Sequence, residues 1–357
     1  MIKKIYINAA SAISPQETFS GKFLNGHAAG YTGNRLRNIE PEYTQLLDAR
    51  SLRRMSRIVK MGSATAAACL KEAGDIHPGA IVTGTAYGCV EDTTIFLSDA
   101  INRKEEALTP TAFIQSTHNT VGAQIALQIK CHNYNNTFVH RGFSFENALL
   151  DALLLLHEEE ANNVLVGSIE ELTDSLFTIL QRFDLYKQGL GSTLDLYKEN
   201  TKGTVAGEGA AFFLLDTERT PATYARLEGA ATFYKPKSNV EIEEEIFGFL
   251  ISNLLKPEAI DLVIIGRNGN VAEEEIYDYV QQTVFPQNAV VNYKHLCGEY
   301  PTSSSFALWL AANICKTGIV PGSLNYTGPG DKKIKRILIY NQYQHTHHSL
   351  LLVSAVQ

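Results

Sequence analysis

Cysteine thiols and histidine imidazoles are the side chains of this sequence best suited to nucleophilic or metal chemistry. The five cysteines are scattered along the chain, and none belongs to a Cys-x-x-Cys pair; they are Cys69, Cys89, Cys131, Cys297 and Cys315. Secreted disulfide frameworks and structural zinc sites usually show even numbers or close spacing. We therefore expect free thiols, no metal, and a reducing, cytoplasmic location.

Three histidines gather near the C-terminus, in the segment Asn341-Gln-Tyr-Gln-His-Thr-His-His348. His345, His347 and His348 could offer imidazole ligands to a metal ion, but no carboxylate accompanies them. Neighbouring residues would also point to opposite faces if the segment were extended. The sequence favours a polar surface loop here over a metal site.

Length and composition narrow the possible classes of protein. The chain has 357 residues, 45% of them hydrophobic and 19% charged, which suits two folded domains. Its net charge of −7 disfavours a generally basic surface, and we expect no nucleic-acid partner. No apolar run is long enough to cross a membrane, so we expect no membrane insertion. The N-terminal segment has the apolar alternation of a strand, at Ile5, Ile7 and Ala9, and we expect a first strand there rather than a signal peptide.

Short β-rich runs alternate with longer helical patterns, which predicts an α/β fold with mixed sheets. The expected strands are Ala80–Thr85, Thr137–His140, Asn163–Gly167, Ala210–Leu215, Leu262–Gly266, Ala289–Asn292, Arg336–Tyr340 and Ser349–Ser354. The expected helices are Arg53–Glu72, Thr120–Ile129, Phe145–Leu156, Val240–Leu255, Ala272–Thr283 and Ser303–Lys316. The helix Phe145–Leu156 has little polar face and should be buried at the centre.

The chain divides into two comparable halves. We place the first at residues 1–216 and the second at residues 223–357, joined by the connector around Thr217–Pro221. Both halves end in consecutive strands, which suggests a structural duplication without an obvious sequence repeat.

Several segments, in order along nearly the whole chain, resemble the β-ketoacyl synthase family. They are Arg53-Arg-Met-Ser-Arg57, Ile81-Val-Thr-Gly-Thr85, Pro110–Ala126, Val164-Leu-Val-Gly-Ser-Ile-Glu170 and Gly207-Glu-Gly-Ala-Ala211. The resemblance implies an α/β, thiolase-like fold: two pseudo-repeated halves in a five-layer α/β/α/β/α arrangement. It implies no cofactor.

Active members of that family use a cysteine nucleophile at a helix N-terminus, together with two histidines and a lysine. Counting from the flanking motifs puts Gly142 at the nucleophile position, where no thioester can form. Ser144 lies two residues further on and is a remote alternative nucleophile. The resemblance puts Arg267 at the first histidine position and Glu299 at the second, while Lys294 retains the family's lysine.

Because Arg267 and Glu299 carry opposite charges, we expect them to form a salt bridge in the former catalytic volume, with Lys294 nearby. In the alternative, both side chains point to solvent from unrelated loops.

The loss of three catalytic side chains resembles the silent subunits known as chain length factors. The resemblance therefore implies a non-catalytic subunit that pairs with an active ketosynthase, meets an acyl carrier protein and shapes the acyl tunnel in fatty acid, polyketide or polyene chain elongation. The stretch Phe113–Asn119 is most similar to proteins of aryl polyene and flexirubin-type pathways. Two alternatives remain open: an active β-ketoacyl synthase or malonyl-thioester decarboxylase with non-standard residues, and a homodimeric acyl-binding or structural protein.

The family's dimer interface supplies the last expectation. The strand Asn136–His140, which includes Phe138, should pair antiparallel with its counterpart across a twofold. Phe113, Gln115 and His118 should lie near that interface and face the partner's acyl tunnel. We expect more than about 2,000 Å² to be buried there. A homodimer in isolation could stand in for the heterodimer.

Overall fold

The computed structural model describes residues 3–21, 23, 26, 28–326 and 333–356. Within these residues, ten strands form one hydrogen-bonded order, β3-β2-β4-β5-β1-β6-β10-β9-β7-β8. The strands are β1 (Ile5–Ile13), β2 (Ala80–Gly84), β3 (Tyr134–Phe138), β4 (Asn163–Glu170), β5 (Gly209–Asp216), β6 (Ala225–Tyr234), β7 (Leu262–Ile265), β8 (Ala289–Asn292), β9 (Arg336–Tyr343) and β10 (His347–Ser354).

The strand order repeats once. In the first half, β1 pairs antiparallel with β5 and β5 with β4, whereas β4, β2 and β3 are parallel. In the second half, β6, β10, β9, β7 and β8 repeat the same order and the same directions. The halves join through a short antiparallel contact between Ile5–Ile7 of β1 and Ala225–Leu227 of β6. The two pseudo-repeated halves expected from the sequence are therefore confirmed, while the division at 216 and 223 stays a prediction.

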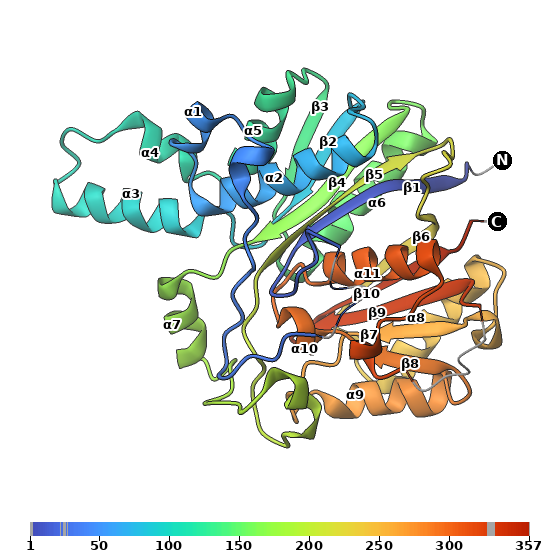
Figure 1. Ribbon diagram of the computed structural model, residues 1–357. Helices are drawn as coiled ribbons and strands as arrows, with labels where there is room; N and C mark the ends of the chain where they lie inside the picture. Colours follow the sequence, from blue (N-terminus) through green and yellow to red (C-terminus); the bar gives the residue numbers. More distant parts are fainter. Residues whose placement is uncertain (1–2, 22, 24–25, 27, 327–332, 357) are drawn as a thin grey trace.

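The strands of each half form one sheet layer. Helices cover these two sheet layers on the outside and separate them in the middle, which gives five layers (Figure 1). The outer layer of the first half contains α2 (Arg57–Glu72) and α5 (Thr120–Ile129). The middle layer contains α6 (Ser144–His157) and α11 (Ser304–Thr317). The other outer layer contains α8 (Asn239–Ser252) and α9 (Glu274–Tyr279). The remaining α-helices are α1 (Ala49–Leu52), α3 (Val90–Asn102), α4 (Pro110–Gln115), α7 (Asp174–Arg182) and α10 (Lys294–Cys297).

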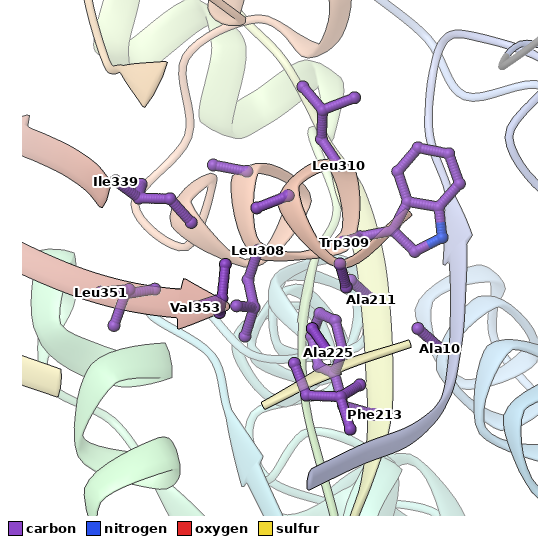
Figure 2. Close-up of a cluster of buried hydrophobic side chains, with 14 of the residues drawn as sticks. Ala10, Ala211, Phe213, Ala225, Leu308, Trp309, Leu310, Ile339, Leu351 and Val353 are labelled. Atoms are coloured by element: carbon purple, nitrogen blue, oxygen red, sulfur yellow. The ribbon is translucent and has the colours of Figure 1, made fainter. Parts of the chain in front are cut away.

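The largest core lies between the sheets, around α11. Figure 2 shows Leu308, Trp309 and Leu310 of this helix among side chains from both halves. α11 is buried on every face from Ser304 to Cys315, because a sheet lies on each side and α6 lies beside it. α6, the helix expected at the centre, has a buried stripe, although its Leu154 is half exposed.

Some boundaries differ from the expectation. The strand predicted at Thr137–His140 runs from Tyr134 to Phe138. Its first residues, Tyr-Asn-Asn, are polar for a strand, but β3 is an edge strand that pairs only with β2, and an edge strand accepts polar residues. The helix predicted from Arg53 begins at Arg57 and follows its N-cap residue Ser56. The elements β6, α3, α4 and α7 were not expected from the sequence, and few of their residues are buried.

Candidate functional site

Gly142 lies in the short turn between β3 and α6 and is buried. A Cβ atom built there would lie 2.9 Å from the Cβ atoms of both Tyr343 and His347. The space around Gly142 is therefore closed by the hairpin that joins β9 and β10. That Gly142 occupies the family's nucleophile position stays a prediction. Ser144 is not free either: its Oγ donates to Arg141 O at 2.9 Å and accepts from His140 N at 2.8 Å.

The expected salt bridge between Arg267 and Glu299 is wrong. Arg267 instead pairs with Glu274 and with Asp278, at 2.5 Å, in the outer helical layer. The physical reason is local: α9 follows within a few residues and offers two carboxylates on the side of the sheet that Arg267 faces. The next residue along the chain, Asn268, is the one whose side chain reaches Glu299.

Glu299 pairs with Lys294, the lysine that we expected near it. The Lys294 Nζ atom donates to both carboxylate oxygens, at 2.9 and 2.7 Å, and to Gln342 O at 3.3 Å. Lys294 is fully buried and Glu299 nearly so. Burial raises the pKa of Glu299 above its ordinary value, and the charge of Lys294 opposes that rise.

Three amides complete what we call the amide–carboxylate network: Asn268, Asn270, Glu273, Lys294, Glu299 and Gln342. Asn268 Nδ2 donates to Glu273 and Glu299, at 3.0 Å in each case. Asn270 Nδ2 donates to Glu273 Oε1 at 2.9 Å, and Gln342 Nε2 also donates to Glu273. Sequence reasoning missed Asn268, Glu273 and Gln342. The alternation of side chains after β7 was the available signal for Asn268.

A pocket opens between this network and the turn that follows β2. Its polar lining includes four carboxylates, Glu170, Glu171, Glu273 and Glu299, and the hydroxyls of four tyrosines, Tyr87, Tyr186, Tyr300 and Tyr343. The Tyr87 and Tyr343 hydroxyls are 3.0 Å apart. Neither a cysteine nor a histidine lines this pocket. It can accept hydrogen bonds, but it holds no nucleophile for acyl transfer.

Glu170 lies at the wall of that pocket and accepts hydrogen bonds from the backbone N–H groups of Ala86 and Tyr87. Burial raises the pKa of Glu170 to about 8, because no cation faces the carboxyl group closely enough to compensate. Burial likewise raises the pKa of Glu171 to about 7.

The expectation of a polar surface loop at Asn341–His348 is wrong. This segment is the hairpin between β9 and β10, with Gln344 and His345 in the left-handed region at its tip. His347 and His348 are buried, and the His348 Nδ1 atom lies 3.0 Å from the Tyr340 hydroxyl. Burial lowers the pKa of His348 to about 4. Among the described residues, no group of three or more potential ligands could hold a metal ion.

The residues expected at a dimer interface lie apart from the network. Phe113 is 57% exposed on α4 and packs against Phe96, with ring centroids 5.5 Å apart. Gln115 donates to Arg54 O, and His118 lies beside Gly88. Phe138 is half-buried against the middle core. Their role in dimerisation stays a prediction.

Several large apolar side chains are exposed on α3, α4, α5 and near β3: Ile95, Leu97, Ile101, Phe113, Ile114, Leu127, Tyr134 and Val139. Leu127 lines one hollow with Ile114 and Gln115, and a second hollow with residues 135–137 of β3. The exposed apolar side chains therefore lie on the helices beside the free edge of β3, whereas the edge itself also carries the polar residues Asn135, Asn136 and Thr137.

The layered fold and the strand order are those of a thiolase-fold protein of the ketosynthase type. Residues 33–210 match the family described as "Beta-ketoacyl synthase, N-terminal domain". The chain belongs to the β-ketoacyl synthase family. No curated protein sequence gives a match.

Solved structures share the fold over their whole length. "The ishigamide ketosynthase/chain length factor" matches with a TM-score of 0.81 and 15% identity, covering 100% of both chains. The ketosynthase ApeO in complex with its chain length factor ApeC, from Xenorhabdus doucetiae, matches at 0.78 and 13%, covering 99% of this chain and 98% of that one. AntDE:AntF, a type II polyketide synthase acyl-carrier protein in complex with its ketosynthase, matches at 0.77 and 14%, covering 100% of both. Among the described residues, the helices are too short or too polar to cross a membrane.

Proposed function

We propose that this chain is a non-catalytic ketosynthase-like subunit of the chain length factor type. It pairs with an active ketosynthase and shapes the acyl tunnel during chain elongation on an acyl carrier protein. The observation that carries the proposal is Gly142: the position lacks a side chain and is packed under Tyr343 and His347.

The chemistry of the pocket supports the same conclusion. Condensation needs a thiolate to hold the acyl group and donors to stabilise the enolate oxygen. Here the corresponding space contains the amide–carboxylate network, whose carboxylates would face the carboxylate of a malonyl thioester. Like charges in a buried pocket disfavour that substrate.

The exposed apolar face beside β3 supports a partner subunit. An unpaired strand edge with apolar neighbours is usually covered in the working assembly. Two of the solved relatives are named for a ketosynthase with its chain length factor, and a third for a ketosynthase with an acyl-carrier protein. By analogy, the partners are an active ketosynthase and an acyl carrier protein. We further propose a cytoplasmic location and a role in aryl polyene or flexirubin-type pigment synthesis.

Two measurements on the full chain test the proposal. The first is co-expression with a ketosynthase that has intact cysteine and histidines, followed by co-purification and mass determination of the complex. The second is incubation of the isolated chain with acyl and malonyl thioesters, followed by intact-mass spectrometry. We expect a stable heterodimer and no acyl adduct.

An acyl adduct, or malonyl decarboxylation by the isolated chain, would instead favour an active synthase or decarboxylase. A homodimer that does not co-purify with any ketosynthase would favour the alternative of a homodimeric acyl-binding or structural protein.

A further inference from the structure

A second hollow lies outside the amide–carboxylate network, near the start of α6. It is lined by Ala86, Val139, His140, Arg141, Phe143, Tyr234 and His347. The lining comes from the turn after β3, the end of β6 and the beginning of β10, so both halves of the molecule contribute. It includes basic and aromatic side chains but no carboxylate.

Positive charge converges on this hollow. Arg141 and Lys235 are exposed, and neither forms an ion pair with a carboxylate of the described residues. The Lys235 Nζ atom lies 5.4 Å from the ring centre of Tyr234. The rings of His140 and His347 are 6.2 Å apart. Burial lowers the pKa of His347, and the charges of His140, Arg141 and Lys235 lower it further. In a chain of net charge −7, such a cluster with no carboxylate in its lining needs an explanation.

Aromatic rings form the walls around the positive groups. The ring centroid of His347 lies 4.6 Å from that of Phe143 and 5.1 Å from that of Tyr234. Rings in these positions give an apolar surface on which a flat or apolar body can pack. The walls therefore suit a ligand with an apolar part beside its charge.

The backbone adds a third feature. Arg141 has a φ of 50°, in the left-handed region that an arginine seldom adopts. This turn precedes the 14 residues of α6, so the hollow lies next to the N-terminus of a long helix. Helix N-termini favour anions through their unpaired N–H groups and the helix dipole.

We propose that this hollow binds an anionic group, phosphate or carboxylate, carried on an apolar or aromatic body. Arg141 and Lys235 supply the charge, His140 and His347 supply further donors, and Phe143 and Tyr234 hold the apolar part. The proposal does not depend on the chain being a silent subunit, because it uses neither Gly142 nor the amide–carboxylate network.

Calorimetric titration of the full chain tests this site with three probes: phenyl phosphate, benzoate and the neutral benzyl alcohol. We expect at least one of the two anions to bind about tenfold or more tightly than the alcohol, since hydrogen bonds to charged groups contribute that much. Tighter binding of phenyl phosphate than of benzoate would assign a phosphate ligand, and the reverse would assign a carboxylate.

Variants locate the binding. The double change Arg141→Gln with Lys235→Gln should weaken anion binding at least about tenfold, because Arg141 lines the hollow and Lys235 lies over the ring of Tyr234, which also lines it. Lys237→Gln should not weaken binding, because the exposed Lys237 neither lines the hollow nor acts on the charge of His347. Both altered side chains are exposed, so melting curves should match the wild type. Equal affinity of the double variant, or no preference for either anion over benzyl alcohol, overturns the proposal. Neither result would bear on pairing with a ketosynthase.

Discussion

At the scale of single residues, the buried pair Lys294–Glu299 sets the character of the site. Two charges in a buried position stabilise each other only while both are present, because each alone would lose its hydration without compensation. Asn268 donates a further hydrogen bond to Glu299, and the amides of Asn268, Asn270 and Gln342 donate to the two oxygen atoms of Glu273. The site is thus a closed set of hydrogen bonds rather than a reactive one.

Replacing Glu299 by Ala should destabilise the fold by roughly 3–5 kcal/mol, because it leaves the Lys294 ammonium buried without its partner. Chemical denaturation measures the change. The double variant Lys294→Met with Glu299→Leu should lose much less. As a control, Asp195→Ala breaks the exposed pair with Lys198 and should cost less than about 1 kcal/mol. A Glu299→Ala variant as stable as the wild type would contradict the role we give this pair.

Glu170 predicts a pH dependence. Burial raises its pKa to about 8 from an ordinary value of 4.5, so the folded protein keeps this proton while the unfolded chain releases it. The contribution to stability is fully present below about pH 4.5 and is lost as the pH rises through about 8. Glu170→Gln should therefore gain stability relative to the wild type between pH 5 and pH 8, by up to several kcal/mol.

Denaturation at a series of pH values measures this difference. Glu245→Gln, at an exposed position, should give the wild-type profile. Parallel profiles for Glu170→Gln and the wild type would show that the folded protein does not hold the proton on Glu170.

At the scale of elements, two connections enclose Gly142, the residue that we propose at the nucleophile position. The turn between β3 and α6 carries Gly142, and the hairpin between β9 and β10 brings Tyr343 and His347 against it. Their contact fills the space around Gly142, although the two segments lie about two hundred residues apart in the sequence.

Gly142→Cys should not create a ketosynthase. The new Cβ would crowd Tyr343 and His347, and we expect a loss of about 1–3 kcal/mol from overpacking. Mass spectrometry after incubation with an acyl and a malonyl thioester should show no condensation product, because no histidine lines the pocket beside the amide–carboxylate network. Gly189→Cys is the matched control, since no heavy atom lies within 4 Å of its added Cβ. Condensation by the Gly142→Cys variant would contradict this account.

At the scale of the whole molecule, the exposed apolar side chains identify the face that we expect a partner to cover. Leu127 is 72% exposed on α5, between the α4 residue Gln115 and the free edge of β3. Ile251 is 67% exposed on α8, in the outer layer of the other half. The two positions have similar exposure on different faces of the molecule.

Leu127→Asp should weaken pairing with a ketosynthase at least about tenfold, because association would place a carboxylate in an apolar interface. Ile251→Asp should leave pairing unchanged. Sedimentation velocity of each variant, mixed with the ketosynthase, measures the effect. Equal losses in both variants, or in neither, would move the interface away from α5 and β3.

The sequence by itself determined the class of fold and the absence of a thiol at position 142. Periodicity placed α5 and β8 at their observed bounds, because long apolar patterns record which face is buried. The resemblance to the family also predicted Lys294 close to Glu299, although it gave Arg267 as the partner of Glu299. These features depend on residues that lie close together in the sequence, so sequence patterns can predict them.

Only the tertiary structure decided how the site is filled. Arg267 and Asn268 are consecutive, and which of them faces inward depends on where β7 ends and where α9 packs. The histidines of the C-terminal segment predicted a polar loop. His347 and His348 are buried instead, because β9 and β10 extend to a tight hairpin that packs against Gly142. Contacts between residues that lie far apart in the chain depend on how two sheet layers pack around a helical layer, and no local sequence pattern predicts that packing.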